Sequence, residues 1–249
     1  MPAPHAEKIA FSRDGDEIRG YLARPGRGEQ PGARHAGLVL VPDVRGLYDH
    51  FRDVARRFAD EGFVTLALDL YSREGTPELA DMDAIFAWMQ ALPDRRVLAD
   101  IGAAVDHLAA RDDVAGDRIG VTGFCMGGQY ALMASCSDLG LAAAVSWYGM
   151  LRYARTSDVK PQSPLEMASA LGCPYLGLFG ADDELVPATD VEELRSVLEH
   201  EKKTYEIEVY DDAGHAFFND SRPEMYRAVA AGRAWPRALA FLNHHLSGR

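Results

Sequence analysis

Short apolar runs alternate with helix-like segments along most of this chain, and that alternation limits the possible folds more than any other feature. Residues 36–42 (AGLVLVP) are continuously apolar, as expected for a strand buried on both faces of a parallel sheet. Residues 51–62 follow with apolar positions at helical spacing and stop at Gly62, and residues 63–70 (FVTLALDL) are apolar again. Strand, helix, strand is the unit of a parallel sheet.

The same order continues toward the C-terminus. Further strands are expected at 118–124, 141–148 and 174–180, and further helices at 98–111, 126–135 and 189–200, before YEIEVYD and a long C-terminal helix. This pattern predicts one α/β domain over residues 1–249, with an open, mostly parallel sheet and helices on both faces. The Gly- and Pro-rich stretch at 23–35 is interpreted as a loop of hairpin size, not a domain boundary.

Composition excludes several classes of function. The net charge of −12, from 26 basic and 38 acidic residues, disfavours nucleic acid and anionic membranes as partners. Three cysteines cannot form a disulfide framework, and no apolar run is long enough to cross a bilayer. The N-terminus lacks the layout of a secretory signal, so we expect a cytoplasmic protein. No group of His, Cys, Asp or Glu has metal-ligand spacing, so no metal is expected.

Residues that directly follow strands are the first candidates for a site, because open parallel sheets bind ligands at the carboxyl ends of their strands. In this chain those residues are Asp43, Asp69, Cys125, Tyr148, Asp183 and His215.

Cys125 lies in the pattern G-x-C-x-G, between a predicted strand and a predicted helix. Gly123 and Gly127 flank it, as in a nucleophile elbow with sulfur in place of oxygen. The glycines are needed because the turn is tight and side chains two residues away would collide with backbone. A helix N-terminus favours a thiolate and can donate to an oxyanion. The alternative is a free cysteine that only packs in a glycine-rich turn.

Two further strand ends supply an acid and a base. Asp183 lies in GADDELVP, where Asp182 and Glu184 compete for the same role, but the spacing to Val186 and Pro187 favours Asp183. His215 lies in DDAGHAFF, after a glycine that lets the backbone bend. The chain order of nucleophile, acid and base is that of α/β-hydrolases.

These motifs together resemble the dienelactone hydrolases, also called carboxymethylenebutenolidases. The resemblance spans roughly residues 8 to 246 and rests on VLVPDVRG, FVTLALDLYSR, GFCMGG, SWYG, GADDELVP and AGHAFF. It implies an α/β-hydrolase fold and hydrolysis of small esters or lactones without a cofactor. It also implies a monomer, with a homodimer as the alternative.

The resemblance also implies residue roles. Cys125 would attack the carbonyl, His215 would act as base and acid, and Asp183 would orient the imidazole. The backbone N–H groups of Met126 and Val44 would form the oxyanion hole.

One further acidic residue has two open interpretations. Asp43 matches the position where the family has an acidic residue, commonly Glu, beside the thiol. Its alternative role is to bind loop amides or to pair with Arg45.

The sequence departs from the family where arginines bind a substrate carboxylate. The position four residues after His215 is Asn219, and the segment after residues 71–73 has no clear match. Arg95 or Arg96 could substitute, but two arginines at a helix start are more often solvated, and Arg152 also fits solvated surface. The candidate pocket residues are Arg45 and Tyr71 together with four aromatic residues that have a core role as their alternative: Trp88, Trp147, Tyr148 and Phe217.

Sulfur restricts the chemistry. A thiolate leaves a tetrahedral intermediate more readily than an ordinary alkoxide, so only esters or lactones with a stabilised leaving oxygen should form the thioester efficiently. Two other functions stay open: a ligand-binding or redox-sensing protein on a hydrolase scaffold, and an acyltransferase that uses the same residues.

Overall fold

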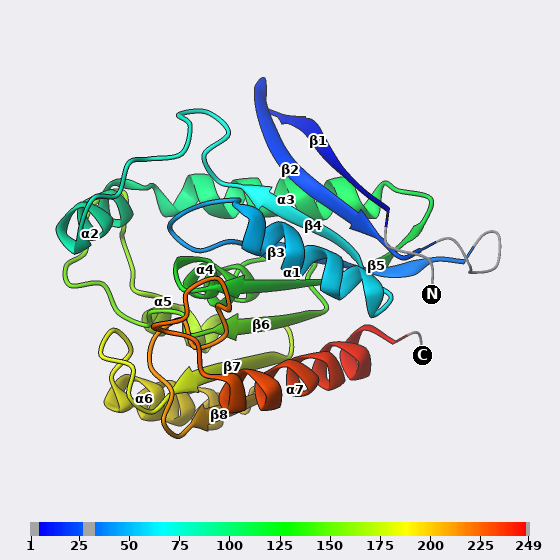
Figure 1. Ribbon diagram of the computed structural model, residues 1–249. Coiled ribbons are helices and arrows are strands. Elements are labelled where there is room, and N and C mark those ends of the chain that lie inside the picture. Colours follow the sequence, from blue (N-terminus) through cyan, green and yellow to red (C-terminus); the bar gives the residue numbers. More distant parts are fainter. Residues whose placement is uncertain (1–4, 27–32, 248–249) are drawn as a thin grey trace.

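One eight-stranded sheet runs through the computed structural model, which describes residues 5–26 and 33–247 (Figure 1). The strands are β1 (His5–Arg13), β2 (Asp16–Arg24), β3 (His35–Val41), β4 (Val64–Asp69), β5 (Val114–Phe124), β6 (Ala143–Trp147), β7 (Tyr175–Gly180) and β8 (Tyr205–Tyr210). Their order in the sheet is β1-β2-β4-β3-β5-β6-β7-β8. β3 to β8 pair in parallel, and β2 is antiparallel to both β1 and β4.

Helices cover both faces of the sheet. They are α1 (Asp49–Asp60), α2 (Met82–Ala91), α3 (Asp94–Ala109), α4 (Met126–Ser135), α5 (Pro164–Met167), α6 (Ala188–His200) and α7 (Ala228–Leu246), with a short 3₁₀ turn at Ala168–Ala170. Apolar residues of α1 and α7 pack on one face, and those of α3, α4 and α6 pack on the other. The predicted α/β architecture, a mostly parallel sheet between two helical layers, is confirmed.

The Gly- and Pro-rich stretch does not join neighbouring strands. It leads from β2 to β3, and β4 lies between these two strands in the sheet. Residues 27–32 of this stretch, like residues 1–4 of the N-terminal segment, lie outside the described residues. No helix in the described part of the chain is long and apolar enough to cross a bilayer.

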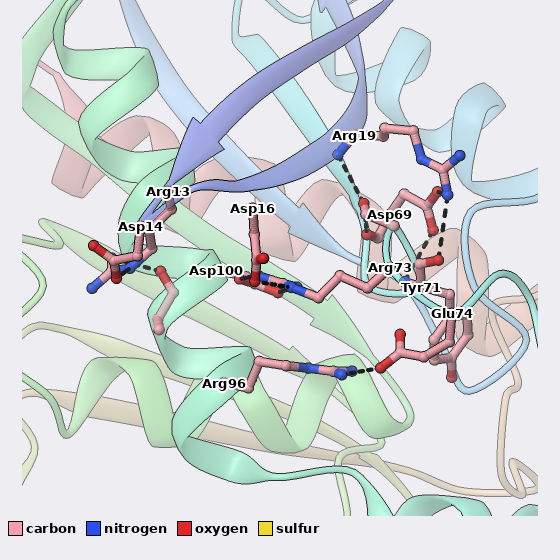
Figure 2. A network of polar contacts seen from close by, with 12 residues as sticks. Arg13, Asp14, Asp16, Arg19, Asp69, Tyr71, Arg73, Glu74, Arg96 and Asp100 are labelled. Carbon is pink, nitrogen blue, oxygen red and sulfur yellow. Dashed lines mark hydrogen bonds and ion pairs between the residues drawn. The ribbon is translucent and has the colours of Figure 1, made fainter.

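A network of ion pairs connects the loop after β4 to α3 and to β2 (Figure 2). The Arg73 guanidinium donates to both carboxylate oxygens of Asp100 on α3, at 2.8 and 2.9 Å, and its Nε donates to Asp16 at 2.6 Å. Two further pairs join Arg96 to Glu74 and Arg19 to Asp69. Asp69 and Arg96 therefore hold the loop around Tyr71 and do not belong to the site, and Arg95 is exposed on α3.

Candidate active site

Cys125 occupies a strained turn between β5 and α4. Its φ of 55° lies in the left-handed region, which side chains other than glycine adopt at a cost in energy. A Cβ on Gly123 would lie 2.0 Å from the carbonyl oxygen of Gly127, and one on Gly127 would lie 2.0 Å from that of Val41. The two glycines of the motif are therefore required by backbone contact, as the sequence predicts.

The loops after β7 and β8 bring an acid and a histidine together. His215 Nδ1 lies 2.9 Å from Asp183 Oδ2, and the other carboxylate oxygen of Asp183 accepts the N–H of Leu185 at 2.9 Å. The carboxylate of Asp183 is buried, whereas Asp182 and Glu184 are exposed. Of the three acidic residues in this loop, Asp183 is the one in contact with the histidine.

The other ring nitrogen, His215 Nε2, is buried and has no hydrogen-bond partner among the described residues. Burial by itself would lower the pKa of His215, but the negative charge of Cys125 and the hydrogen bond with Asp183 outweigh it, and the pKa is raised. His215 and Cys125 line the same cavity. The arrangement can therefore hold a proton on the imidazole beside Cys125.

Two predicted pocket residues, Tyr148 and Phe217, form an aromatic pair that packs against His215. The Tyr148 ring, on a residue with a φ of 42°, packs edge-on against the His215 ring with centroids 5.3 Å apart. Phe217 packs against Tyr148 in the same way. Both side chains are buried, so they fix the imidazole and do not line the cavity.

Asp43 follows β3 and is also buried. Its Oδ1 accepts the N–H of Arg45 at 2.8 Å, and its Oδ2 accepts the hydroxyl of Tyr48 at 3.1 Å. Burial raises the pKa of this carboxyl, and the hydrogen bonds from Arg45 and Tyr48 offset only part of that effect. Of the two interpretations for Asp43, binding to a loop amide is the contact that the structure contains. The carboxyl nevertheless lines the same cavity as Cys125.

Asn219, at the position where the family has an arginine, lies outside the cavity. It is 1% exposed, and its side-chain amide donates to the Tyr48 hydroxyl at 2.7 Å. Tyr48 thus links Asn219 to Asp43. The side chain at this position therefore has a structural role here and does not line the cavity.

The cavity beside Cys125 has a volume of about 410 Å³, within the usual range for small-molecule sites. Its apolar wall comprises Met82, Ile85, Phe86 and Met89 of α2 together with Met150, Leu185, Ala216 and Met225. Its charged groups, besides Asp43, are Arg45, Asp182, Glu184 and Arg222. Four residues of the apolar wall are methionines, whose unbranched side chains adapt to ligands of different shape.

The structure places most of the other predicted pocket residues in the core. Arg45 lines the cavity, whereas Trp147 is fully buried, stacks on Phe124 and donates to the Thr122 hydroxyl at 3.1 Å. Tyr71 is fully buried, and Trp88 is half-buried against it. These aromatic side chains are large and apolar, and each buries much area when it packs in the core beside the sheet.

The cavity residues that the sequence did not predict are Arg222, the apolar face of α2, and Met150, Leu185, Ala216 and Met225. An aspartate before an apolar helix is a typical N-cap signal, so the start of α2 could have been predicted, and in the structure Asp81 accepts the N–H of Ala84 at 2.8 Å. Arg222 lies in an irregular segment between His215 and α7, where no periodicity signals its direction.

The model of the dienelactone hydrolase family matches residues 18–246. The chain belongs to the dienelactone hydrolase family. It is similar to a Bradyrhizobium sp. protein named "Probable 2-oxo-3-(5-oxofuran-2-ylidene)propanoate lactonase", with 35% identity over 97% of this chain and 95% of that protein. A carboxymethylenebutenolidase of Rhodococcus opacus is 30% identical over 84% of this chain and 81% of its own length.

The crystal structure of a protein named "Putative Dienelactone Hydrolase", from Klebsiella pneumoniae subsp. pneumoniae, has the same fold. It superimposes with a TM-score of 0.89 at 35% identity, over 96% of this chain and 98% of that chain. This dienelactone hydrolase family member therefore has the α/β-hydrolase fold and is an enzyme of the class that hydrolyses carboxylic esters and lactones.

Proposed function

We propose that the protein hydrolyses small activated esters and lactones through a thioester on Cys125, with His215 as base and acid and Asp183 as its partner. The observation that carries this proposal is the His215–Asp183 contact of 2.9 Å beside a cysteine held at a strained strand-to-helix turn. The unpartnered Nε2 of His215 is the ring atom left to exchange a proton with the thiol.

The first half of the reaction forms the thioester. The thiol proton of Cys125 passes to His215 Nε2, and the thiolate attacks the carbonyl carbon of the substrate. The oxyanion that results is held by the N–H of Met126, the first residue of α4, and by the N–H of Val44 in the loop after β3. As the carbon–oxygen bond breaks, the imidazolium returns its proton to the leaving oxygen.

The second half releases the acid. His215 removes a proton from water while the hydroxide that forms adds to the thioester carbonyl. The tetrahedral intermediate then expels the thiolate, the imidazolium returns its proton to the sulfur, and the product carboxylic acid leaves. Asp183 keeps the proton of the neutral imidazole on Nδ1, so Nε2 is free to accept a proton in both halves.

Two of the five charged residues that line the cavity, Arg45 and Arg222, favour a substrate that carries a carboxylate, whereas Asp182 and Glu184 are exposed carboxylates. Both arginines act on the charge of Asp43, so they lie close enough to attract an anion bound beside the thiol, although Arg222 Nε also donates to Glu224 at 3.1 Å. The substrate in the name of the Bradyrhizobium relative is a lactone with a carboxylate group. We therefore propose anionic lactones or enol esters as the preferred class, bound by arginines at positions different from those of the family pattern.

The thioester tests the proposal directly. Wild-type protein should hydrolyse p-nitrophenyl acetate with a burst, and rapid quenching in acid should leave one acetyl group on Cys125, detectable by mass spectrometry of peptides. Cys125→Ala should abolish both, whereas Cys136→Ala, at the far end of α4, should retain them. Lack of turnover with every activated ester tried, or an acetyl group on a residue other than Cys125, would contradict the proposal.

Anion recognition has a separate test. Arg222→Gln should lower kcat/KM for an aryl ester of a dicarboxylic acid by roughly tenfold, because it removes a charge-assisted contact, and should lower it much less for the neutral ester of equal length. Equal losses for the two esters would argue against a carboxylate site at Arg222.

A further inference from the structure

A second cavity adjoins the one that contains Cys125. It has a volume of about 350 Å³, and five residues line both cavities: Phe86, Met89, Met150, Glu184 and Leu185. The partition between them is therefore one side chain thick and consists largely of apolar, flexible groups. A substrate with a long non-reacting part could extend from the thiol across this partition.

Gln129 lines only the second cavity and lies one helical turn beyond the proposed nucleophile. Its backbone N–H donates to the carbonyl oxygen of Cys125 at 3.0 Å, which places it about 6 Å farther along α4. Its side chain is 1% exposed, and the side-chain oxygen Oε1 has no hydrogen-bond partner in the described part of the chain.

The orientation of the Gln129 amide follows from its neighbours. Gln129 Nε2 lies 2.9 Å from the Tyr153 hydroxyl, which lies 2.9 Å from Asp94 Oδ2. A carboxylate only accepts, so the single proton of the hydroxyl is donated to Asp94, and the hydroxyl must accept from Gln129. The Nε2 group therefore faces Tyr153, and Oε1 is the atom left without a donor.

Asp94 itself is held in place by other groups. Lys160 donates to it at 2.6 Å and Tyr130 at 2.9 Å, and all of these side chains are buried. The rigid network prevents the glutamine from turning to satisfy its oxygen elsewhere. A buried acceptor without a partner is unfavourable, so a ligand that supplies a donor there would be bound preferentially.

We infer that the second cavity is a subsite for the non-reacting end of an elongated ester or lactone, and that Gln129 Oε1 selects a hydroxyl or amide N–H at that end. The apolar partition suits a hydrocarbon segment between the carbonyl and the donor. Met89 and Met150 can turn aside to admit the chain, because their side chains are unbranched. The inference rests on the proposed hydrolysis at Cys125 and adds a substrate class to it.

Matched substrate pairs test the subsite. The first pair is the p-nitrophenyl esters of ω-hydroxyhexanoic and heptanoic acid, which have equal length and end in a hydroxyl or a methyl group. The second pair is phenyl acetates whose rings carry an ω-hydroxyalkyl or an alkyl chain of equal length. In at least one pair, wild type should prefer the hydroxyl member by about three- to tenfold in kcat/KM, the range of one hydrogen bond.

Variants assign the preference to Gln129. Gln129→Met, which is similar in size and lacks the acceptor, should reduce the hydroxyl-to-methyl ratio to one or below. Gln90→Met is a change of the same kind at another glutamine that lines this cavity, on α2, and should keep the wild-type ratio. If Gln129→Met does not fold, Ala154→Trp, which fills the second cavity from its exposed edge, should remove the preference.

The outcomes separate this subsite from the proposed reaction. p-Nitrophenyl acetate is too short to reach Gln129, so a wild-type protein unable to hydrolyse it would overturn the proposed function. If that ester is hydrolysed but neither pair shows a preference for the hydroxyl member, or the preference survives Gln129→Met, the subsite is overturned and the reaction stands.

Discussion

The buried hydroxyl of Tyr71 donates a hydrogen bond to the carbonyl oxygen of Val44 at 2.7 Å. On the other side of the same peptide group, the N–H of Arg45 donates to Asp43 at 2.8 Å. Both polar groups of the Val44–Arg45 peptide are therefore held. Because this peptide directly follows the N–H of Val44, Tyr71 fixes the direction of the second donor in the proposed oxyanion hole.

Tyr71→Phe should lower kcat by about tenfold with a smaller change in KM. Loss of an oxyanion donor typically reduces kcat by about a hundredfold or more, and a donor that is only less well aligned should lose part of that. Steady-state kinetics with p-nitrophenyl acetate measure the effect. Tyr175→Phe is the control, since it removes another buried hydroxyl, one with no hydrogen-bond partner in the described ranges. Equal kcat values for the two variants would rule out a positioning role for Tyr71.

Asp183→Asn should reduce kcat by roughly a thousandfold or more, because the amide no longer fixes the imidazole tautomer that leaves Nε2 as the proton acceptor. The matched control is Asp182→Asn. Asp182 is the neighbouring acidic residue, and it lines the cavity beside Cys125, whereas the residue in contact with His215 is Asp183. The effect of Asp182→Asn should be less than about tenfold. A larger loss from Asp182→Asn than from Asp183→Asn would reverse the assignment of the acid.

The sequence was sufficient to predict the parallel part of the sheet and the helices that cover its two faces, but it did not predict α2 or the short α5. β3, β4 and β7 are buried along almost their whole length, so they appear as continuous apolar runs with a strong signal. Neither β1 nor β2 was predicted. The side chains of β1 are all exposed or half-buried at the edge of the sheet, where no apolar pattern is imposed, and those of β2 are only partly buried. A strand can therefore be predicted from apolar residues only where the sheet buries its side chains.

The candidate site was also predicted only in part. Cys125, Asp183 and His215 were found because each lies at or shortly after the end of a strand: Cys125 directly follows the buried end of β5, Asp183 lies three residues after the buried β7, and His215 lies five residues after β8, which is mostly half-buried. Glycines needed by the backbone mark the turn around Cys125. The cavity wall was not found, because its direction depends on how irregular loops are held. Asn219 illustrates this: its amide is bound to Tyr48, far away in the sequence, and no local pattern reveals that contact.

Asp43→Asn should stabilise the folded protein at neutral pH. Burial raises the pKa of Asp43, so the ionised carboxylate is less favourable in the folded than in the unfolded chain. At pH values above the raised pKa this lowers the free energy of unfolding, and a pKa one pH unit higher in the folded chain corresponds to a loss of about 1.4 kcal/mol. An asparagine avoids that loss and can still accept the N–H of Arg45.

The stabilisation by Asp43→Asn should diminish as the pH falls through the raised pKa, because the wild-type carboxyl then binds its proton. Below the ordinary aspartate value of 3.8, the difference between the two proteins should no longer change with pH. Urea unfolding of both proteins at a series of pH values measures it. A variant less stable than wild type at neutral pH would mean that the hydrogen bonds to the carboxylate outweigh its burial.

Gly127→Ala should destabilise the protein by about 3 kcal/mol or more, because the new Cβ would lie 2.0 Å from the carbonyl oxygen of Val41 and two backbone segments would have to separate. Gly232→Ala, in the middle of α7 with no atom within 4 Å of the added Cβ, is the matched control and should stabilise by up to about 1 kcal/mol. Urea unfolding midpoints compare the two. If Gly127→Ala were as stable as Gly232→Ala, the close contact between α4 and β3 that holds Cys125 in its turn would not exist in solution.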